Sequence, residues 1–395
     1  MNISFVITTF NIENYILKCL KSVAEIARPG DQIILVDDGS YDNTVPVIEK
    51  FIADEGFGQD REYTPIYLEE NTVGGVGTGG NIGIENARRE GLFFVDGDDW
   101  VLSFEFENAR NAFEVSGCDI LIANYKEWDE AASKSKLPAD HKIWKTLEEW
   151  PSKRIEARDF ALKLIAVPWR KFYRMDFVKK HKLRYPEGDF FFEDNPFHWS
   201  VCLAAKKITF IDIPICMHRI NRPGQTMASV GTELIAFFEH YQTIEKLLPK
   251  RNRELKTQAM RWIVDNMIWH INRLQPVAFE CYIHEAIQTF DTFNAKIWTD
   301  TILPYLTSFD ELKPLFVYIK QGKHWAAIQQ LFDIYSERMQ RNIIAVQSQT
   351  NNTLFKYNLP TTPKIVSKET IESEMARHNR LCREFRQKVN PLEGM

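Results

Sequence analysis

Strand and helix signals alternate through the first hundred residues, and this order limits the fold more than any other feature of the sequence. Strand signals at 3–10, 32–40, 63–71 and 92–99 predict four strands, and helical periodicity at 14–27 predicts a helix between the first two. The second strand is too apolar at 33–36 to alternate, which is typical of a parallel strand covered on both faces. The sequence therefore predicts an α/β fold with a Rossmann-like, mainly parallel sheet flanked by helices.

The composition fits a soluble globular protein and excludes several other classes. The 395 residues are 44% hydrophobic and 26% charged, which is ordinary for a chain of two or three domains. The net charge of -5 gives no basic field that would attract nucleic acid. The six cysteines are widely spaced and form no CxxC pair, so we predict reduced thiols in the cytoplasm rather than a zinc site or a disulfide framework. No signal peptide and no run of ~18 apolar residues is present, so contact with the inner face of the membrane would be peripheral.

The second half of the chain has a different character, which predicts a domain boundary near residue 230. Glycine becomes scarce there, and helical periodicity dominates. Helices are predicted at 233–248, 254–274, 324–343 and 369–389. A short polar linker is predicted at 347–353. We therefore expect an α/β domain at 1–230 and a helical domain at 231–395, whose helices pack into a core, pair two copies as a homodimer, or lie on anionic lipid.

An acidic cluster follows the apolar strand that ends near residue 95. Asp96, Asp98 and Asp99 come within four positions, and a glycine separates the first two. Carboxylates at this spacing can face one hard cation, and Mg²⁺ or Mn²⁺ prefers oxygen ligands of this kind. The alternative is an acidic surface turn in which Asp98 caps a helix. The apolar strand directly before the cluster favours the metal site.

Two further turns offer contacts to a ligand. Asp37 and Asp38 follow the second strand, where a carboxylate can accept a hydrogen bond from a base or a ribose, or cap the next helix. The glycine-rich stretch 73–83 can bring backbone N–H groups close to a diphosphate. It lacks the GK[ST] of a P-loop, and a flexible connection into a helix at 84–91 is the plainer interpretation.

Carboxylates and cations gather again between residues 171 and 225. The stretch 171–185 reads as a helix, and a second helix begins near Glu193 and Asp194, whose charges suit either a helix N-terminus or a general base. His218 and two nearby arginines surround a Pro-Gly turn. Guanidinium groups can hold a diphosphate or a sugar acid, and His218 is either a metal ligand or a structural residue.

In this order, these segments resemble the family-2 glycosyltransferases with the GT-A fold, of the type that makes bacterial polysaccharides or capsules. "ILVDDGSYDNT" is close to the family's usual "VDDGSTD" turn, and "NIGIENARREGLFFVDGDDW" is similar to its stretch that ends in "DSDD". "VPWRKFYRMDFVKKHKLRYPEGDFFFED" resembles its "WNKLY" to "ED" segment. The resemblance covers roughly residues 1–230. It departs at Gly80, where the family often has an arginine before the asparagine of this motif.

The resemblance implies a donor site for a nucleotide-diphosphate sugar. By matching position, Thr8 and Asp38 would contact the nucleobase, and Asp96 would lie by the ribose. Asp98 would hold Mn²⁺ or Mg²⁺ on the diphosphate, with His218 as a further candidate ligand.

The resemblance also implies a base and a loop that closes the donor site. Asp194 would deprotonate the acceptor hydroxyl, with Glu193 beside it. Arg219, Arg222 and Gln225 would belong to the loop that folds over the donor phosphates.

The function implied is that of an inverting, metal-dependent glycosyltransferase of hexosyltransferase type. It would move a sugar from a nucleotide-diphosphate donor, with UDP as the first expectation, to a hydroxyl of a saccharide or a lipid-linked acceptor in cell-surface polysaccharide synthesis. Two alternatives stay open at this point. A nucleotidyltransferase would also use a nucleotide, a metal and an α/β sheet, but the glycine-rich stretch has no basic residue for a triphosphate. A non-catalytic scaffold of the same fold would need neither Asp98 nor Asp194.

Overall fold

The computed structural model describes most of the chain up to residue 356, with side chains up to residue 345. The internal residues that it leaves out are 73–74, 147–148, 152, 189–190, 224 and 226–229. The chain divides into two compact units, Met1–Asp333 and Ile334–Met395. The helix predicted at 369–389 lies outside the described residues.

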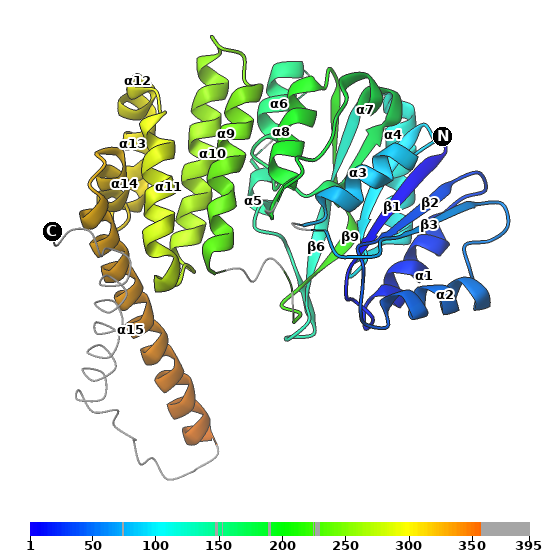
Figure 1. The fold of residues 1–395 in the computed structure, drawn as a ribbon, viewed down its shortest axis with the longest axis horizontal. Coiled ribbons are helices and arrows are strands. Elements are labelled where there is room, and N and C mark those ends of the chain that lie inside the picture. The colour runs from blue at the N-terminus through cyan, green and yellow to red at the C-terminus, as the bar shows by residue number, and fades with distance from the viewer. Residues whose placement is uncertain are drawn as a thin grey trace. The chain divides into compact units, whose positions relative to one another are not determined.

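A nine-stranded sheet organises the first 220 residues (Figure 1). Its strand order is β3-β2-β1-β4-β8-β6-β9-β5, and β7 pairs with β6 outside this path. The strands are β1 (Ile3–Thr9), β2 (Gln32–Asp37), β3 (Glu62–Tyr67), β4 (Gly91–Asp96), β5 (Trp100–Val101), β6 (Ile120–Asp129), β7 (Lys134–Lys136), β8 (Lys171–Arg174) and β9 (Ile208–Ile220).

The first four strands in the chain form the parallel part of the sheet, as predicted. β1 lies between β2 and β4 and runs parallel to both. The register places Thr8 opposite Val36 on one side and opposite Asp96 on the other. The carboxyl ends of these three strands therefore meet at one edge, which is where ligands bind in open α/β sheets.

The rest of the sheet mixes parallel and antiparallel pairs. β8 runs antiparallel between β4 and β6, whereas β6 and β9 are parallel. The prediction of a helix from residue 171 was wrong for its first turn, because residues 171–174 fill the gap between two strands of the sheet. Only the following segment is helical, as α7 (Met175–His181). Pairing on both sides outweighs the weak helix preference of four residues.

Helices cover both faces of the sheet, because side chains alternate along each strand. On one face, Phe106 of α4 (Ser103–Ser116) packs against Phe5 and Phe93, with ring centroids 5.8 and 4.9 Å away. On the other face, α3 (Gly77–Asn86) packs against Val6. The remaining helices before residue 205 are α1 (Ile16–Ile26), α2 (Thr44–Asp54), α5 (His141–Trp144), α6 (Arg154–Ala161) and α8 (Asp194–Ala204).

Helices make up the described chain from residue 232 to residue 356, as predicted for most of this range. α8 packs on α9 (Ala236–Leu247), which packs on α10 (Arg253–Ile271) (Figure 1). They are followed by α11 (Phe279–Asp291), α12 (Ala295–Ile297), α13 (Leu303–Tyr305), α14 (Lys313–Lys320) and α15 (His324–Lys356). The polar linker predicted at 347–353 was wrong, because α15 continues through it. Within the described residues, no helix is both long and apolar enough to cross a lipid bilayer.

Candidate active site

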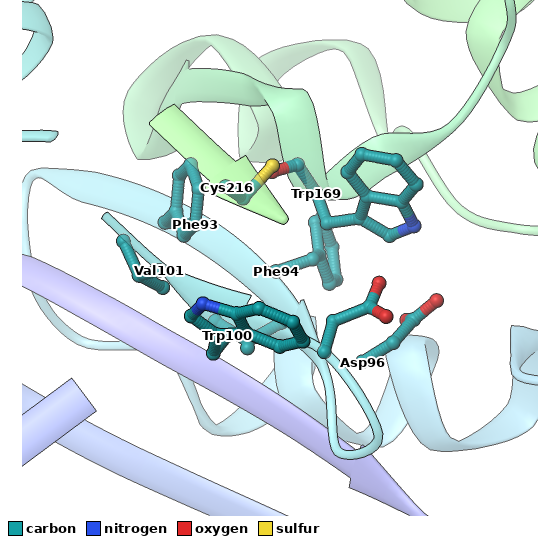
Figure 2. A pocket seen from close by; sticks show the side chains of 9 residues that line it. Phe93, Phe94, Asp96, Trp100, Val101, Trp169 and Cys216 are labelled. Carbon is teal, nitrogen blue, oxygen red and sulfur yellow. The ribbon is translucent and has the colours of Figure 1, made fainter. Parts of the chain in front are cut away.

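An acidic triad, Asp96, Asp98 and Asp99, lies at the carboxyl end of β4. One carboxylate oxygen from each residue lies within 4.8 Å of those from the other two. The turn requires glycine at position 97, because a Cβ there would clash with its neighbours. It would lie 2.6 Å from Ile12 Cδ1 and 2.9 Å from the carbonyl oxygen of Thr8 in β1. Asp96 and Asp99 also line a small cavity with aromatic walls (Figure 2). The cluster predicted from the sequence is therefore a real convergence of three carboxylates.

Cationic side chains from the end of β9 face the triad. Arg222 Nε contacts the Asp98 carboxylate, and His218 Nδ1 lies 2.9 Å from Asp99 Oδ2. The backbone N–H of Arg219 donates to Asp99 Oδ1 at 2.7 Å. The predicted metal ligands and part of the predicted phosphate loop therefore come together at one place.

The charges of the triad depend strongly on one another. Burial and the carboxylates of Asp99 and Asp98 raise the pKa of Asp96 well above its usual range. Burial also raises the pKa of Asp99, although His218 acts in the opposite direction. Burial opposes protonation of His218, but the triad carboxylates, Asp99 first, raise its pKa to about 9. The site is thus rich in negative charge that a cation would offset.

The triad offers the ligand atoms that a hard divalent cation needs. Carboxylate oxygens at short mutual distances are the usual protein ligands of Mg²⁺ and Mn²⁺. Asp98 is already paired with a guanidinium, which shows that the position favours positive charge. The Nδ1 atom of His218 faces Asp99. The imidazole ring of His218 stacks on the indole of Trp169, with ring centroids 4.9 Å apart. The residues present therefore fit a divalent cation.

The two aspartates after β2 have different environments. The Asp37 carboxylate accepts hydrogen bonds from Thr9 Oγ1 at 2.7 Å and from the Ser40 backbone N–H at 2.8 Å, so it holds its own turn together. The Asp38 carboxylate is half-buried and accepts from the Thr72 N–H at 2.9 Å. Burial raises the pKa of Asp38, although the bonds from Thr72 lower it. The Asp38 N–H donates to the carbonyl oxygen of Thr9 at 2.9 Å, which places Asp38 at the end of β1.

Two aromatic side chains at this edge escaped the sequence analysis. Phe10 follows β1 directly and is 38% exposed, and Tyr41 in the turn after β2 is 85% exposed. Their rings meet edge to face with centroids 6.0 Å apart. The Tyr41 N–H donates to Asn11 Oδ1 at 3.0 Å, which ties the two turns together. An aromatic residue directly after an apolar strand was the available signal.

Glu193 and Asp194 lie at the start of α8, as predicted, but they differ in their partners. Glu193 is 3% exposed and accepts a hydrogen bond from the Gly77 N–H at 2.6 Å. Burial raises the pKa of Glu193 to about 7. Burial likewise raises the pKa of Asp194 to about 6, although the buried ammonium of Lys171 acts against it. Asp194 is also close enough to the triad to raise the pKa of Asp96.

The glycine-rich stretch is largely helix rather than a flexible loop, which corrects the plainer interpretation. α3 begins at Gly77 and ends at Asn86, whereas the sequence predicted a helix only from residue 84. A Cβ on Gly83 would lie 2.2 Å from Val6 Cγ1, and a Cβ on Gly80 would lie 2.8 Å from the Tyr185 ring. The glycines are therefore needed for close packing, and Tyr185 borders the place where the resemblance expects an arginine.

The remaining predicted residues lie at the end of β9 and directly after it. Arg219 is buried, and its guanidinium lies over the rings of Tyr15 and Trp100, at 4.7 and 5.1 Å from their centroids. It also pairs with Glu130. Gln225 Nε2 donates to the Arg219 carbonyl oxygen at 2.6 Å. Arg219 and Gln225 thus hold this segment beside the triad.

Part of the chain matches a known protein family. Residues 4–182 match the model of Glycosyl transferase family 2. EpsH of Bacillus subtilis (strain 168), named for an inferred glycosyltransferase activity, is 28% identical over 223 residues, which cover 55% of this chain and 61% of EpsH. TarS of Staphylococcus aureus (strain MW2), a poly(ribitol-phosphate) β-N-acetylglucosaminyltransferase, is 24% identical over 241 residues, which cover 60% of this chain and 39% of TarS. Both alignments span less than two thirds of the relative's own length.

A solved structure confirms the fold. Residues 1–349 of S. aureus TarS, crystallised with UDP-GlcNAc, superpose with a TM-score of 0.65 at 20% sequence identity. The superposition covers 86% of this chain and 92% of that one. The superposition therefore extends beyond residue 230 into the helical region, for which the sequence showed no resemblance. Residues 4–182 therefore form a glycosyl transferase family 2 domain, and the chain has a GT-A fold followed by a helical region.

Proposed function

We propose that this protein is an inverting, metal-dependent glycosyltransferase that moves a sugar from a nucleotide-diphosphate donor to a hydroxyl of a saccharide or lipid-linked acceptor. One observation carries the proposal. The acidic triad begins at the end of β4, where Asp96 is opposite Thr8 of β1, and the Asp194 carboxylate of α8 is near enough to raise the pKa of Asp96. A transfer of this kind needs a nucleotide site, a charge site for the diphosphate and one base.

The donor would bind along the carboxyl ends of β1, β2 and β4. We assign the nucleobase to Thr8 and Asp38 and the ribose to Asp96, because Thr8 and Asp96 are neighbours in the register. UDP is the nucleotide that we propose, since the superposed TarS structure was solved with UDP-GlcNAc. Cell-surface polysaccharide is the acceptor class that we propose, in line with the poly(ribitol-phosphate) acceptor in the name of TarS.

Asp98 would hold Mn²⁺ or Mg²⁺, together with other oxygen atoms of the triad, and His218 would complete or support that set. The bound ion would offset the charge that builds on the departing diphosphate. Arg222 already contacts Asp98, so its guanidinium is within reach of a phosphate bound there. Arg219 and Gln225 would keep the Arg222 segment in place.

Asp194 would remove the proton from the acceptor hydroxyl as that oxygen attacks the anomeric carbon. Its pKa of about 6 leaves it ionised near neutral pH and still able to accept a proton. Glu193 is buried and bonded to the backbone of Gly77, so we assign it to holding α3 beside the base.

Release of UDP tests this proposal. The purified protein would be incubated with UDP-sugars, Mn²⁺ and saccharide acceptors, and UDP would be measured against time. We expect turnover in the wild type, and in Asp194→Asn we expect donor binding without transfer. Asp119→Asn is the matched control, because Asp119 lies in a turn away from the triad, where it accepts backbone hydrogen bonds from Lys206 and Lys207. Near-normal turnover in Asp194→Asn would refute the base assignment.

The two domains would have different roles. We propose that residues 1–230 bind the donor and catalyse transfer, and that residues 231–395 contact the acceptor, a second copy or the membrane surface. Sedimentation of the full chain, with and without anionic vesicles, would separate these roles: a dimer supports pairing, and co-sedimentation with vesicles supports peripheral binding.

A further inference from the structure

The residue directly before Glu193 has an unusual backbone conformation. Phe192 has a φ of +67°, in the left-handed region that a bulky aromatic residue rarely adopts. Its carbonyl oxygen accepts hydrogen bonds from the Asn195 backbone N–H at 3.1 Å and from Asn195 Nδ2 at 3.0 Å. Asn195 Nδ2 also donates to Asp194 Oδ1 at 3.0 Å. The conformation of Phe192 is therefore linked directly to the direction of the Asp194 carboxylate.

A histidine of α9 holds this segment by its backbone. His240 Nε2 lies 2.7 Å from the carbonyl oxygen of Phe191, and the side chain of His240 is 1% exposed. Burial lowers the pKa of His240 to about 4, so the ring is neutral near neutral pH. Because a carbonyl oxygen only accepts, the Nε2–H tautomer must donate this bond.

A phenylalanine of the same helix holds the neighbouring side chain. Phe237 precedes His240 by three positions, so both point from one face of α9. Its ring centroid lies 4.8 Å from that of Phe192. Phe237 is itself fixed by α10, with His270 at 4.5 Å and Trp262 at 5.8 Å. Strained backbone persists only where the surroundings determine it, and here those surroundings come from the helical region.

We propose that His240 and Phe237, on α9 of the helical region, are positioning residues that fix the 191–192 segment and thereby aim the carboxylate of Asp194 at the acceptor. The proposal rests on the proposed function, because it assumes that Asp194 is the base. It gives the helical region a part in catalysis: α3 holds Glu193 through Gly77, and α9 holds the residues immediately before it.

Three variants test this proposal. His240→Leu removes the hydrogen bond to Phe191, and His240→Gln retains an N–H donor at similar reach. Tyr282→Phe is the matched control, because it removes an equally buried hydrogen bond, 2.8 Å long, between Tyr282 and His270 of the same helical region. A purely structural role for His240 predicts that His240→Leu and Tyr282→Phe behave alike.

The first readout is amide hydrogen exchange of the peptide 191–197 in the full-length protein, which requires no substrate. We expect His240→Leu to raise exchange there at least about tenfold, whereas Tyr282→Phe leaves it unchanged and His240→Gln restores protection. The second readout is steady-state kinetics. We expect kcat of His240→Leu to fall between about tenfold and about a hundredfold with an unchanged KM for the donor, since a small misplacement of a reacting group has this effect.

The outcomes are distinguishable. If the wild type transfers no sugar, the proposed function fails, and the exchange data alone still decide whether α9 fixes the segment. Equal exchange and equal kcat in His240→Leu and Tyr282→Phe would overturn the positioning role. Should His240→Leu not fold, Phe237→Leu takes its place with the same two readouts and the same criteria.

Discussion

At the scale of single residues, the site is explained by the pairing of Asp98 with Arg222. A carboxylate that is almost fully buried needs a partner, and here the partner is a guanidinium from the segment after β9. If Asp98 takes up a divalent cation, Arg222 must share or leave that carboxylate. The guanidinium would then be available to the donor phosphates, for which its planar donors are suited.

Asp98→Ala is expected to abolish the metal-dependent part of donor binding. The variant loses a charged oxygen ligand and leaves Arg222 without its carboxylate, so the affinity for UDP with Mn²⁺ should fall at least about tenfold. Titration calorimetry with UDP, with and without Mn²⁺, measures this. Asp129→Ala is the control, because Asp129 lies at the end of β6, outside the triad, where it bonds Asn221. Unchanged affinity of Asp98→Ala with Mn²⁺ would argue against the metal site.

The pH dependence of kcat should report on Asp194. Burial raises its pKa to about 6, against the effect of Lys171, and Asp194 in turn raises the pKa of Glu193 and of Asp96. A base must be ionised to act, so activity is present above the pKa and lost as the pH falls through it. We expect kcat to decline below about pH 6 by about tenfold per pH unit. A profile that stays flat down to about pH 5, in protein still folded by circular dichroism, would contradict this assignment.

At the scale of elements, α3 shows where sequence patterns reach their limit. The glycines that suggested a flexible loop are in a helix, because β1 and Tyr185 leave no space for a Cβ at Gly83 and Gly80. Glycine weakens an isolated helix by about 1 kcal/mol relative to alanine, so local preference points away from the observed structure. Only the tertiary contact explains why glycine occupies these helical positions, and a single sequence does not show that contact.

Gly83→Ala should destabilise the protein by about 1–3 kcal/mol. The added methyl group would overlap Val6, whose Cγ1 lies 2.2 Å from the ideal Cβ position. Urea unfolding measures the change. In a Val6→Ala background the same substitution should cost much less, because the space is then open. An equal cost in both backgrounds would show that the close approach of α3 to β1 is not the cause.

Removal of one partner from the buried ion pair between Arg110 of α4 and Asp31 before β2 should destabilise the protein strongly. Both side chains are 0% exposed, and Arg110 donates to the two Asp31 oxygens at 2.7 and 2.9 Å. Arg110→Met leaves a buried carboxylate without its counter-charge, which costs about 3–5 kcal/mol. The exposed pair Arg253–Asp300 is the control, and Arg253→Met should cost less than about 1 kcal/mol. Thermal unfolding that shows similar losses for both variants would contradict this account.

At the scale of the whole molecule, the periodic sequence patterns predicted the main layout. Apolar strands followed by amphipathic helices indicated the sheet and the helical region, because burial sets both periods. The antiparallel insertion of β8 and the contact of α9 with the residues before Asp194 depend on neighbours more than 40 positions away. The triad could be predicted because three acidic residues follow one strand. The positions of Phe10 and Lys171 in the site could not be predicted, because they depend on residues distant in the sequence.

The central claim is that the acidic triad binds a divalent cation together with a nucleotide diphosphate. The most direct test is a crystal structure with Mn²⁺ and UDP, in which the anomalous signal locates manganese. We predict a manganese peak at Asp98, with diphosphate oxygens among its ligands and the Arg222 guanidinium turned from Asp98 toward a phosphate. Manganese and UDP bound elsewhere, with Arg222 still paired to Asp98, would contradict the account.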